Sequence, residues 1–137
     1  MRITAGHAKG RVFKTPEGSS TRPTDARTRE TLFNIVGERV VDARVLDLYA
    51  GSGALGLEAL SRGASWCHFV EQNPAACRLI RDNIQSLGFD ENAIVWQTNI
   101  KSAVGRLLEL QARDETPQLI EGTVSETQSS KLKVEFQ

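Results

Sequence analysis

The sequence of 137 residues lacks the features that mark several large classes of protein. None of its apolar runs approaches the 18 residues of a membrane-spanning helix, and the start, MRITAGHAKG, has no signal-peptide core. Cys67 and Cys77 are the only thiols, and we expect them to be buried and free. His7 and His68 stand too far apart in the sequence to indicate a metal site. We therefore expect a cytoplasmic protein without a membrane partner or a metal.

The net charge of the chain is zero, but its two ends differ. The first 29 residues carry seven Lys and Arg and two acidic residues, a net +5, so the remainder carries −5. The seven are Arg2, Lys9, Arg11, Lys14, Arg22, Arg27 and Arg29. A basic N-terminal arm on an acidic body predicts a polyanion partner that is contacted mainly by the arm. A solvated basic tail without a partner is the alternative.

Strands and helices are expected to alternate along most of the chain. Residues 2–14 are expected to form a cation-rich hairpin of two short strands, and Thr24 to cap a helix that runs to about Gly37. Further elements are expected as a strand, turn and helix over 44–61, a strand over 66–71, a helix over 74–88, a strand over 93–97 and a helix over about 101–111. This alternation predicts an α/β fold of right-handed parallel βαβ units.

Residues 44–60, RVLDLYAGSGALGLEAL, join a short apolar strand to a helix through glycines at positions 51, 53 and 56. The G-x-G-x-x-G spacing allows positive φ and lets the backbone approach a ligand closely. A tight strand-to-helix turn without a ligand would use the same residues, so the glycine pattern alone is weak evidence for a ligand site.

Polar residues at the ends of the expected strands strengthen this interpretation. Asp47 lies inside the first strand, where a carboxylate is costly unless it receives hydrogen bonds or a cation. Glu71 ends the second strand, 18 residues after Gly53, close to the separation at which an acid binds ribose hydroxyls in βαβ units. Asn99 follows the third strand. Because the carboxyl ends of parallel strands share one edge, we expect a nucleoside-cofactor pocket there.

Several further segments combine with the glycine turn into a more specific pattern. They are residues 2–6 (RITAG), 9–11 (KGR), 22–24 (RPT) with Arg27, 29–30 (RE), 32–34 (LFN) and 47–62. Through them, residues 1–112 resemble the bacterial methyltransferase family that methylates the exocyclic N2 of a guanine in small-subunit (16S) ribosomal RNA. The resemblance implies a Rossmann-like S-adenosylmethionine methyltransferase fold with a seven-stranded sheet, and S-adenosylmethionine as the cofactor.

The resemblance also implies roles for individual residues. Asp47 and the loop 51–53 would hold the methionine part of the cofactor, and Glu71 would hold its ribose hydroxyls. Asn99 would lie by the adenine, while Thr24, Arg29 and Asn34 would close the pocket from the N-terminal side. The full cofactor set is Thr24, Arg29, Asn34, Asp47, Tyr49, Gly51, Ser52, Gly53, Glu71, Gln72 and Asn99. Phosphates of small-subunit rRNA or of the 30S particle would be bound by Arg2, Lys9, Arg11, Lys14 and Arg22.

One part of the family pattern is absent from this sequence. The family holds its amine nucleophile with an Asp/Asn-Pro-Pro-Tyr/Phe motif at the end of strand four. Oxygens of the Asp or Asn side chain and of a backbone carbonyl accept the amine protons, and the Tyr or Phe ring stacks on the extruded base. Here the prolines at 16, 23, 74 and 117 are all isolated, so we assign no catalytic residue. Strand four should begin near Gln118, where the sequence becomes polar.

Without strand four, the apolar strand 45–49 would be an open sheet edge. There are three alternatives: residues 131–136, which alternate polar and apolar, pair with that edge, a second chain does so in a dimer, or the protein is only marginally stable. The expected sheet is thus parallel, preceded by a β-hairpin, and incomplete after strand three. We divide the chain into residues 1–112, the basic hairpin with the cofactor-binding half, and residues 113–137, a divergent polar tail.

Three functions are compatible with these patterns. The first is an S-adenosylmethionine-dependent rRNA (guanine-N2)-methyltransferase. The second, favoured by the missing motif, is a catalytically inactive module that binds S-adenosylmethionine or RNA. The third is a nicotinamide-dependent oxidoreductase; against it, the dehydrogenase fingerprint starts its glycines at the strand end, whereas residues 47–50 intervene here.

Overall fold

The computed structural model describes residues 1–17, 23–112, 119–120 and 132–135. Helices and strands alternate through residue 112, as predicted. In chain order the elements are α1 (Pro23–Val36), η1 (Gly37–Val40), β1 (Arg44–Asp47), α2 (Ala54–Ser61), β2 (Trp66–Glu71), α3 (Pro74–Leu87), η2 (Asp90–Asn92), β3 (Ala93–Gln97), α4 (Ile100–Ala112), β4 (Leu119–Ile120) and β5 (Leu132–Glu135).

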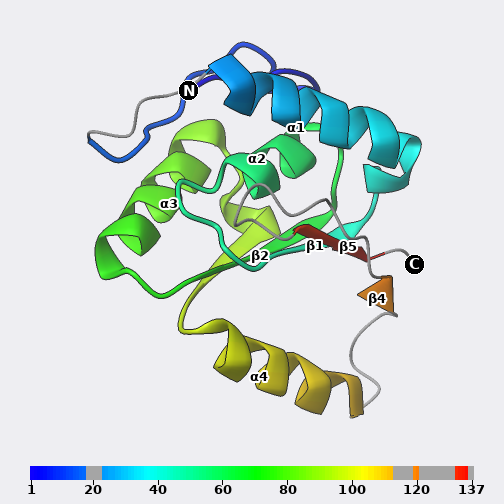
Figure 1. Cartoon of the computed structure of the whole chain (residues 1–137), viewed down its shortest axis with the longest axis vertical. Coiled ribbons are helices and arrows are strands. Elements are labelled where there is room, and N and C mark those ends of the chain that lie inside the picture. The colour runs from blue at the N-terminus through cyan, green and yellow to red at the C-terminus, as the bar shows by residue number, and fades with distance from the viewer. Residues whose placement is uncertain (18–22, 113–118, 121–131, 136–137) are drawn as a thin grey trace.

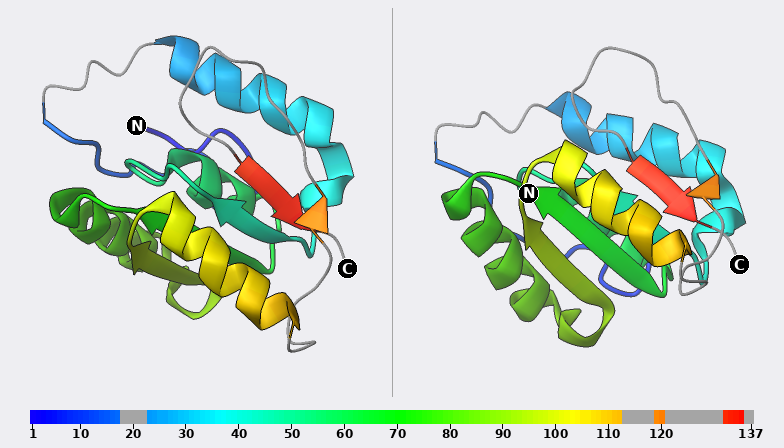
Figure 2. Two further views of the ribbon diagram at one scale, coloured as in Figure 1. Left: turned by 60° about the horizontal axis from the view of Figure 1, so that its bottom comes forward. Right: turned by 90° about the horizontal axis from the view of Figure 1, so that it is seen from below.

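A five-stranded sheet in the order β3-β2-β1-β5-β4 forms the middle layer of the molecule. Helices α1, α2 and α3 lie on one face of the sheet and α4 on the other (Figure 1, Figure 2). Side chains of β1 alternate between the two faces, so Val45 packs in the core under α1 to α3 whereas Leu46 packs toward α4. This is the three-layer α/β arrangement that the sequence predicts.

The bounds of β2 and β3 agree with the prediction, but the start of α1 does not. The helix begins at Pro23, so Thr24 lies inside its first turn and is not the residue before it. Proline suits that place because its fixed φ is helical and its missing N–H has no intrahelical partner to lose. At α3, Asn73 caps the first turn by accepting from the N–H groups of Ala75 (2.9 Å) and Ala76 (3.2 Å).

The N-terminal arm, residues 1–17, turns back on itself but does not form the two strands that the sequence predicts. Its pairing is limited to one antiparallel bridge between Arg2 and Val12, supported by the hydrogen bond from Ile3 N to Arg11 O at 3.0 Å. Ile3, Ala8 and Phe13 are buried, so the arm contributes to the core. It is therefore a strap packed on the body of the protein.

The strap is held by the carboxylate of Glu58, in the middle of α2, which is fully buried. Glu58 accepts from Thr4 N (3.1 Å), Thr4 Oγ1 (2.6 Å) and Ala5 N (3.0 Å). It also forms ion pairs with Arg29 of α1 (3.5 Å) and with Arg62 (3.2 Å). One side chain thus connects the arm, α1 and α2.

Replacing Glu58 by Gln is expected to lower the free energy of unfolding by about 3 to 5 kcal/mol, because it leaves the buried Arg29 guanidinium without a counter-charge. Urea denaturation measures this difference. The matched control is Glu109→Gln on the exposed side of α4, where a small change is expected. A loss at Glu58 no larger than that of the control would contradict the role given to this carboxylate.

The edge of β1 that the sequence leaves open is occupied by the tail of the chain. Strand β5 runs antiparallel to β1, with Val45 opposite Val134 and Asp47 opposite Leu132. The two-residue β4 pairs with β5 and not with β1, so the tail departs from the strand order implied for the family. Of the alternatives for this edge, pairing by the tail is the one that the structure shows, through Leu132–Glu135, and the sheet is mixed rather than wholly parallel.

Deleting residues 132–137 is expected to expose the backbone of β1 and to cause self-association. Size-exclusion chromatography with light scattering would show dimers or larger species that the whole chain does not form. Deleting residues 136–137 alone retains β5 and is the control. A monomeric deletion variant of unchanged stability would show that β5 does not protect this edge.

Candidate functional site

The turn after β1 is tied to the carboxyl end of β2. Ala50 N donates to Val70 O at 3.1 Å, and Gly51 N donates to Glu71 Oε2 at 3.0 Å. Thr98 N in turn donates to Glu71 O at 3.1 Å, which connects the end of β3 to the same edge. The expected juxtaposition of the glycine turn, Glu71 and the end of β3 is therefore present.

Two of the glycines are required by the geometry of the turn. Gly53 precedes α2 with φ of 82°, in the left-handed region where a side chain is strained. At Gly56 a Cβ atom would lie 2.3 Å from Cε1 of Phe69, so any side chain would push α2 away from β2. The first glycines shape the turn and the third permits close packing of helix on strand.

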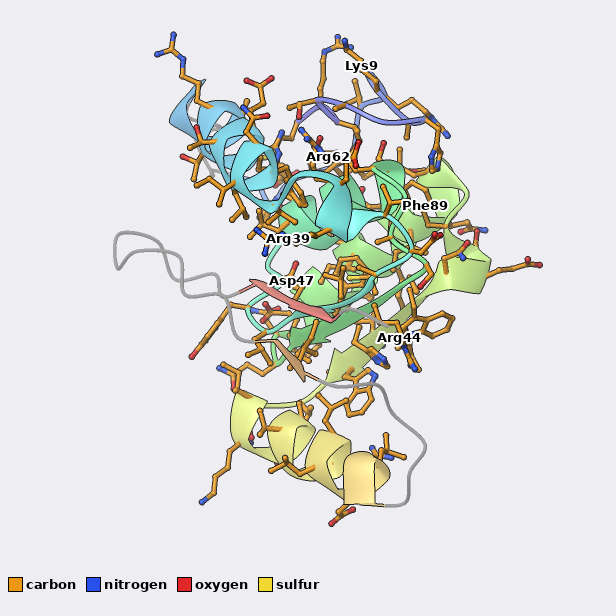
Figure 3. All side chains as sticks on the ribbon, turned by 90° about the vertical axis from the view of Figure 1, so that its right-hand side faces the viewer. Lys9, Arg39, Arg44, Asp47, Arg62 and Phe89 are labelled. Atoms are coloured by element: carbon orange, nitrogen blue, oxygen red, sulfur yellow. The ribbon has the colours of Figure 1, made fainter. Side chains whose placement is uncertain are left out.

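Asp47, the last residue of β1, points to the same face as α2. Its side chain is 1% exposed, and Oδ2 accepts from Gly56 N, in the first turn of α2, at 3.2 Å. The other oxygen, Oδ1, has no hydrogen-bond partner among the described residues. Figure 3 places Asp47 between the sheet and the layer that contains Arg62. Buried carboxylate oxygens are seldom left without a donor, so this atom indicates a missing cationic or N–H partner.

Burial raises the pKa of Asp47 from 3.8 to about 7, and the negative charge of Glu71 adds to the rise. The N–H groups of Gly56 and Tyr49 act in the opposite direction and favour the ionised form. A cation placed at Oδ1 would replace part of the lost hydration and lower the pKa again.

The other predicted cofactor residues near this edge are placed as follows. Glu71 Oε1 accepts from Asn73 N at 3.0 Å, so both its oxygens are held while each retains a second lone pair. Tyr49 and Gln72 are exposed. Asn99 is exposed too, and its Oδ1 accepts from Ser102 N at 2.8 Å in the first turn of α4.

The three residues expected on the N-terminal side all belong to α1. Arg29 is 3% exposed and donates to Met1 Sδ (2.8 Å) and Arg2 O (2.7 Å) as well as pairing with Glu58. Asn34 is exposed, and the side chain of Thr24 lies outside the described part of the structure. Among the described residues, no hydrogen bond or ion pair joins Arg29 or Asn34 to the glycine turn. A role for them at a cofactor stays a prediction.

The predicted RNA-binding residues that the structure describes are all exposed, but they differ in what their side chains contact. Lys9 is exposed at the outer rim of the arm (Figure 3), and Arg2 and Lys14 are exposed as well. Arg11 is exposed too, but it donates to Leu87 O (3.1 Å) and Ser86 O at the carboxyl end of α3, where a cation interacts favourably with the helix dipole. Arg22 lies outside the described residues.

Sequence reasoning missed Glu58, Arg62 and Asn83, which hold the site together. Glu58 lies within the otherwise apolar helix ALGLEALS, and Asn83 falls on the buried stripe of α3 with Ile80 and Leu87. A charged or amide side chain on a buried face needs partners, and this is the signal that could have identified both.

The described part of the chain gives no sign of a metal or membrane site. It contains no cluster of three or more His, Cys, Asp or Glu side chains, and none of its helices is long and apolar enough to cross a membrane. Cys67 and Cys77 are free and buried, as predicted.

The parallel strand order β3-β2-β1, the glycine turn and the acids at the strand ends define a Rossmann-like α/β fold of the methyltransferase type. The chain belongs to the family described as conserved hypothetical protein 95, whose model matches residues 1–120. The resemblance to a methyltransferase family is thereby confirmed.

Individual relatives agree with this assignment. The chain is 40% identical over 104 residues to the Bacillus subtilis protein named "Putative rRNA methyltransferase YlbH", covering 76% of this chain and 56% of the relative. It is 45% identical over 87 residues to the ribosomal RNA small subunit methyltransferase D of Escherichia coli K12, covering 64% and 44%. A solved structure titled "Putative methyltransferase yhhF from Escherichia coli" matches with a TM-score of 0.69 and 43% identity, covering 76% and 56%. The chain thus spans about half the length of the curated relatives that it matches.

The raised pKa of Asp47 predicts a pH-dependent cost to stability. The pKa of Asp47 is about 7 in the folded protein and 3.8 as the ordinary value, so between pH 3.8 and about 7 the folded protein keeps a proton that the unfolded chain has lost. The contribution of Asp47 to the free energy of unfolding therefore falls as pH rises through this range. Relative to the wild type, Asp47→Asn is therefore expected to gain up to about 4 kcal/mol in free energy of unfolding between about pH 4 and pH 8. Urea denaturation across this range measures the gain, with Asp42→Asn at an exposed position as control. A difference that does not change with pH would contradict the prediction.

Proposed function

We infer that the edge formed by the ends of β1 and β2 binds S-adenosylmethionine, and that the chain is an S-adenosylmethionine-dependent methyltransferase of small-subunit rRNA. The observation that carries this inference is the buried Asp47 carboxylate beside the glycine turn, with Oδ1 lacking a partner among the described residues. The cofactor carries an ammonium group, which would supply the missing donor and charge at that oxygen.

The surrounding residues fit the rest of such a cofactor. The backbone at Gly51 is open to a ligand, because a Cβ there would meet no atom within 4 Å. Glu71, held by Gly51 N and Asn73 N, keeps lone pairs for two ribose hydroxyls. Asn99, at the end of the neighbouring strand, is the candidate for the adenine side, and Tyr49 and Gln72 are exposed beside the same strand ends.

In this proposal the cofactor supplies an electrophilic methyl group, and the chain supplies binding and orientation. Asp47 fixes the methionine end and Glu71 the ribose end, so the cofactor is held at both sides of the turn. The exposed Arg2, Lys9 and Lys14 bind phosphates of the rRNA strand, an interaction that weakens as salt rises. The exocyclic N2 of a guanine is the acceptor that the family resemblance implies.

A second function is favoured by one specific observation. The sequence contains no Pro-Pro pair and hence no Asp/Asn-Pro-Pro-Tyr/Phe motif to accept the protons of an amine nucleophile. Without such acceptors the amine lone pair stays delocalised in the base, and cofactor binding does not lead to transfer. The alternative is therefore a catalytically inactive module that binds S-adenosylmethionine or RNA.

Calorimetric titration of S-adenosylmethionine into the whole chain tests the shared part of both functions. We expect micromolar binding that Asp47→Asn weakens at least about tenfold, because a charge-assisted contact is lost. Asp42→Asn is the matched control and should bind as the wild type does. Absence of binding by a folded wild-type chain, or equal binding by the Asp47 variant, would refute the proposed site.

Transfer of a labelled methyl group to 30S particles and to naked small-subunit rRNA separates the two functions. Incorporation that depends on Asp47 supports the methyltransferase. Binding of the cofactor without incorporation in either substrate supports the inactive module.

A further inference from the structure

We propose that Asn83 is a positioning residue that couples the basic N-terminal arm to the glycine turn, so that occupation of one site restrains the other. This inference rests on the proposed function, because the two sites are those of the rRNA phosphates and of S-adenosylmethionine. Its structural basis is a set of three hydrogen bonds made by one buried amide.

Asn83 lies in α3 and is 1% exposed. Its Oδ1 accepts from Lys14 N at 2.8 Å, and its Nδ2 donates to Lys14 O at 2.9 Å. The amide therefore pairs with both backbone groups of Lys14, as a neighbouring β-strand would. Lys14 carries one of the exposed cations of the arm, so the backbone from which this cation projects is held by α3.

The second N–H of the same Nδ2 donates to Ser52 O at 3.2 Å. Ser52 lies between Gly51, whose N–H is bound by Glu71, and Gly53, which begins the turn into α2. All three hydrogen-bonding positions used by the Asn83 amide are thus directed at backbone groups, two in the arm and one in the turn. Both donors of the amide are needed, so neither Asp nor Leu can replace it.

The connection has no second route as short among the described residues. Arg11 ties the arm to the far end of α3, at Ser86 and Leu87. Glu58 ties the arm to α1 and α2, and Ser61 ties it to the end of α2. None of these side chains contacts the glycine turn. A restraint placed on the Ser52 carbonyl by a cofactor is therefore transmitted to Lys14 through Asn83, and a restraint on the arm is transmitted in reverse.

Hydrogen exchange of the Lys14 amide reports directly on this connection, because that N–H is the donor to Asn83. In the wild type, S-adenosylhomocysteine is expected to slow exchange of the Lys14 amide about fivefold or more, in addition to amides of the turn at 51–56. Slowed exchange in the turn with no change at Lys14 would overturn the coupling and leave the proposed cofactor site intact. Absence of any change in the turn and of binding heat would overturn both.

The variant Asn83→Asp separates positioning from mere stability. It keeps an oxygen for Lys14 N–H but removes the N–H donors to Ser52 O and to Lys14 O, so the cofactor analogue should still slow exchange in the turn but no longer at Lys14. Asn92→Asp, at an exposed amide that donates to Ser65 O at 3.1 Å, is the control and should retain the wild-type effect. A retained effect in Asn83→Asp would overturn the proposal, and if this variant does not fold, the wild-type measurement decides alone.

Discussion

The buried carboxylate of Glu58 is the interaction on which the arrangement of the N-terminal half depends. A charge with no exposure to water is tolerated only with complete pairing, and Glu58 obtains it from backbone donors of the arm and from Arg29 and Arg62. These partners belong to segments that are distant in the sequence. Satisfying one carboxylate therefore fixes the strap, α1 and the end of α2 relative to one another.

A consequence is that the basic arm is organised before any partner binds. Thr4 and Ala5 are held by Glu58, Ala8 N is held by Ser61 Oγ at 3.0 Å, and Lys14 is held by Asn83. Side chains such as Lys9 then project from a fixed backbone. Binding a polyanion to a preorganised arm costs less conformational entropy than ordering a free tail, so fewer cations suffice for a given affinity.

The sequence predicted the parts of the fold that local chemistry determines. Periodicity and cap residues located β2, α3 and β3, because Pro74, Gly88 and alternating apolar runs act on their own neighbours. It also identified Asp47 and Glu71, because placing a carboxylate at the end of an apolar strand has a desolvation cost that can be recognised before its partner is known. For Glu58 and Asn83, a polar side chain on an apolar helix face signals only that a partner is needed; which residues of the arm those partners are could not be predicted, because they lie more than 50 positions away.

The direction of β5 determines which end of this strand lies beside the glycine turn. In the register of β1 and β5, Leu132 stands opposite Asp47 and Glu135 stands opposite Arg44. The carboxyl end of β5 therefore lies at the edge away from the glycine turn, whereas a strand parallel to β1 would end beside it. An antiparallel tail can satisfy the backbone of β1, but its own carboxyl end does not lie beside Asp47. Under the proposed function, covering the edge and presenting an acceptor motif beside the glycine turn are thus distinct demands on the chain, and β5 meets the first.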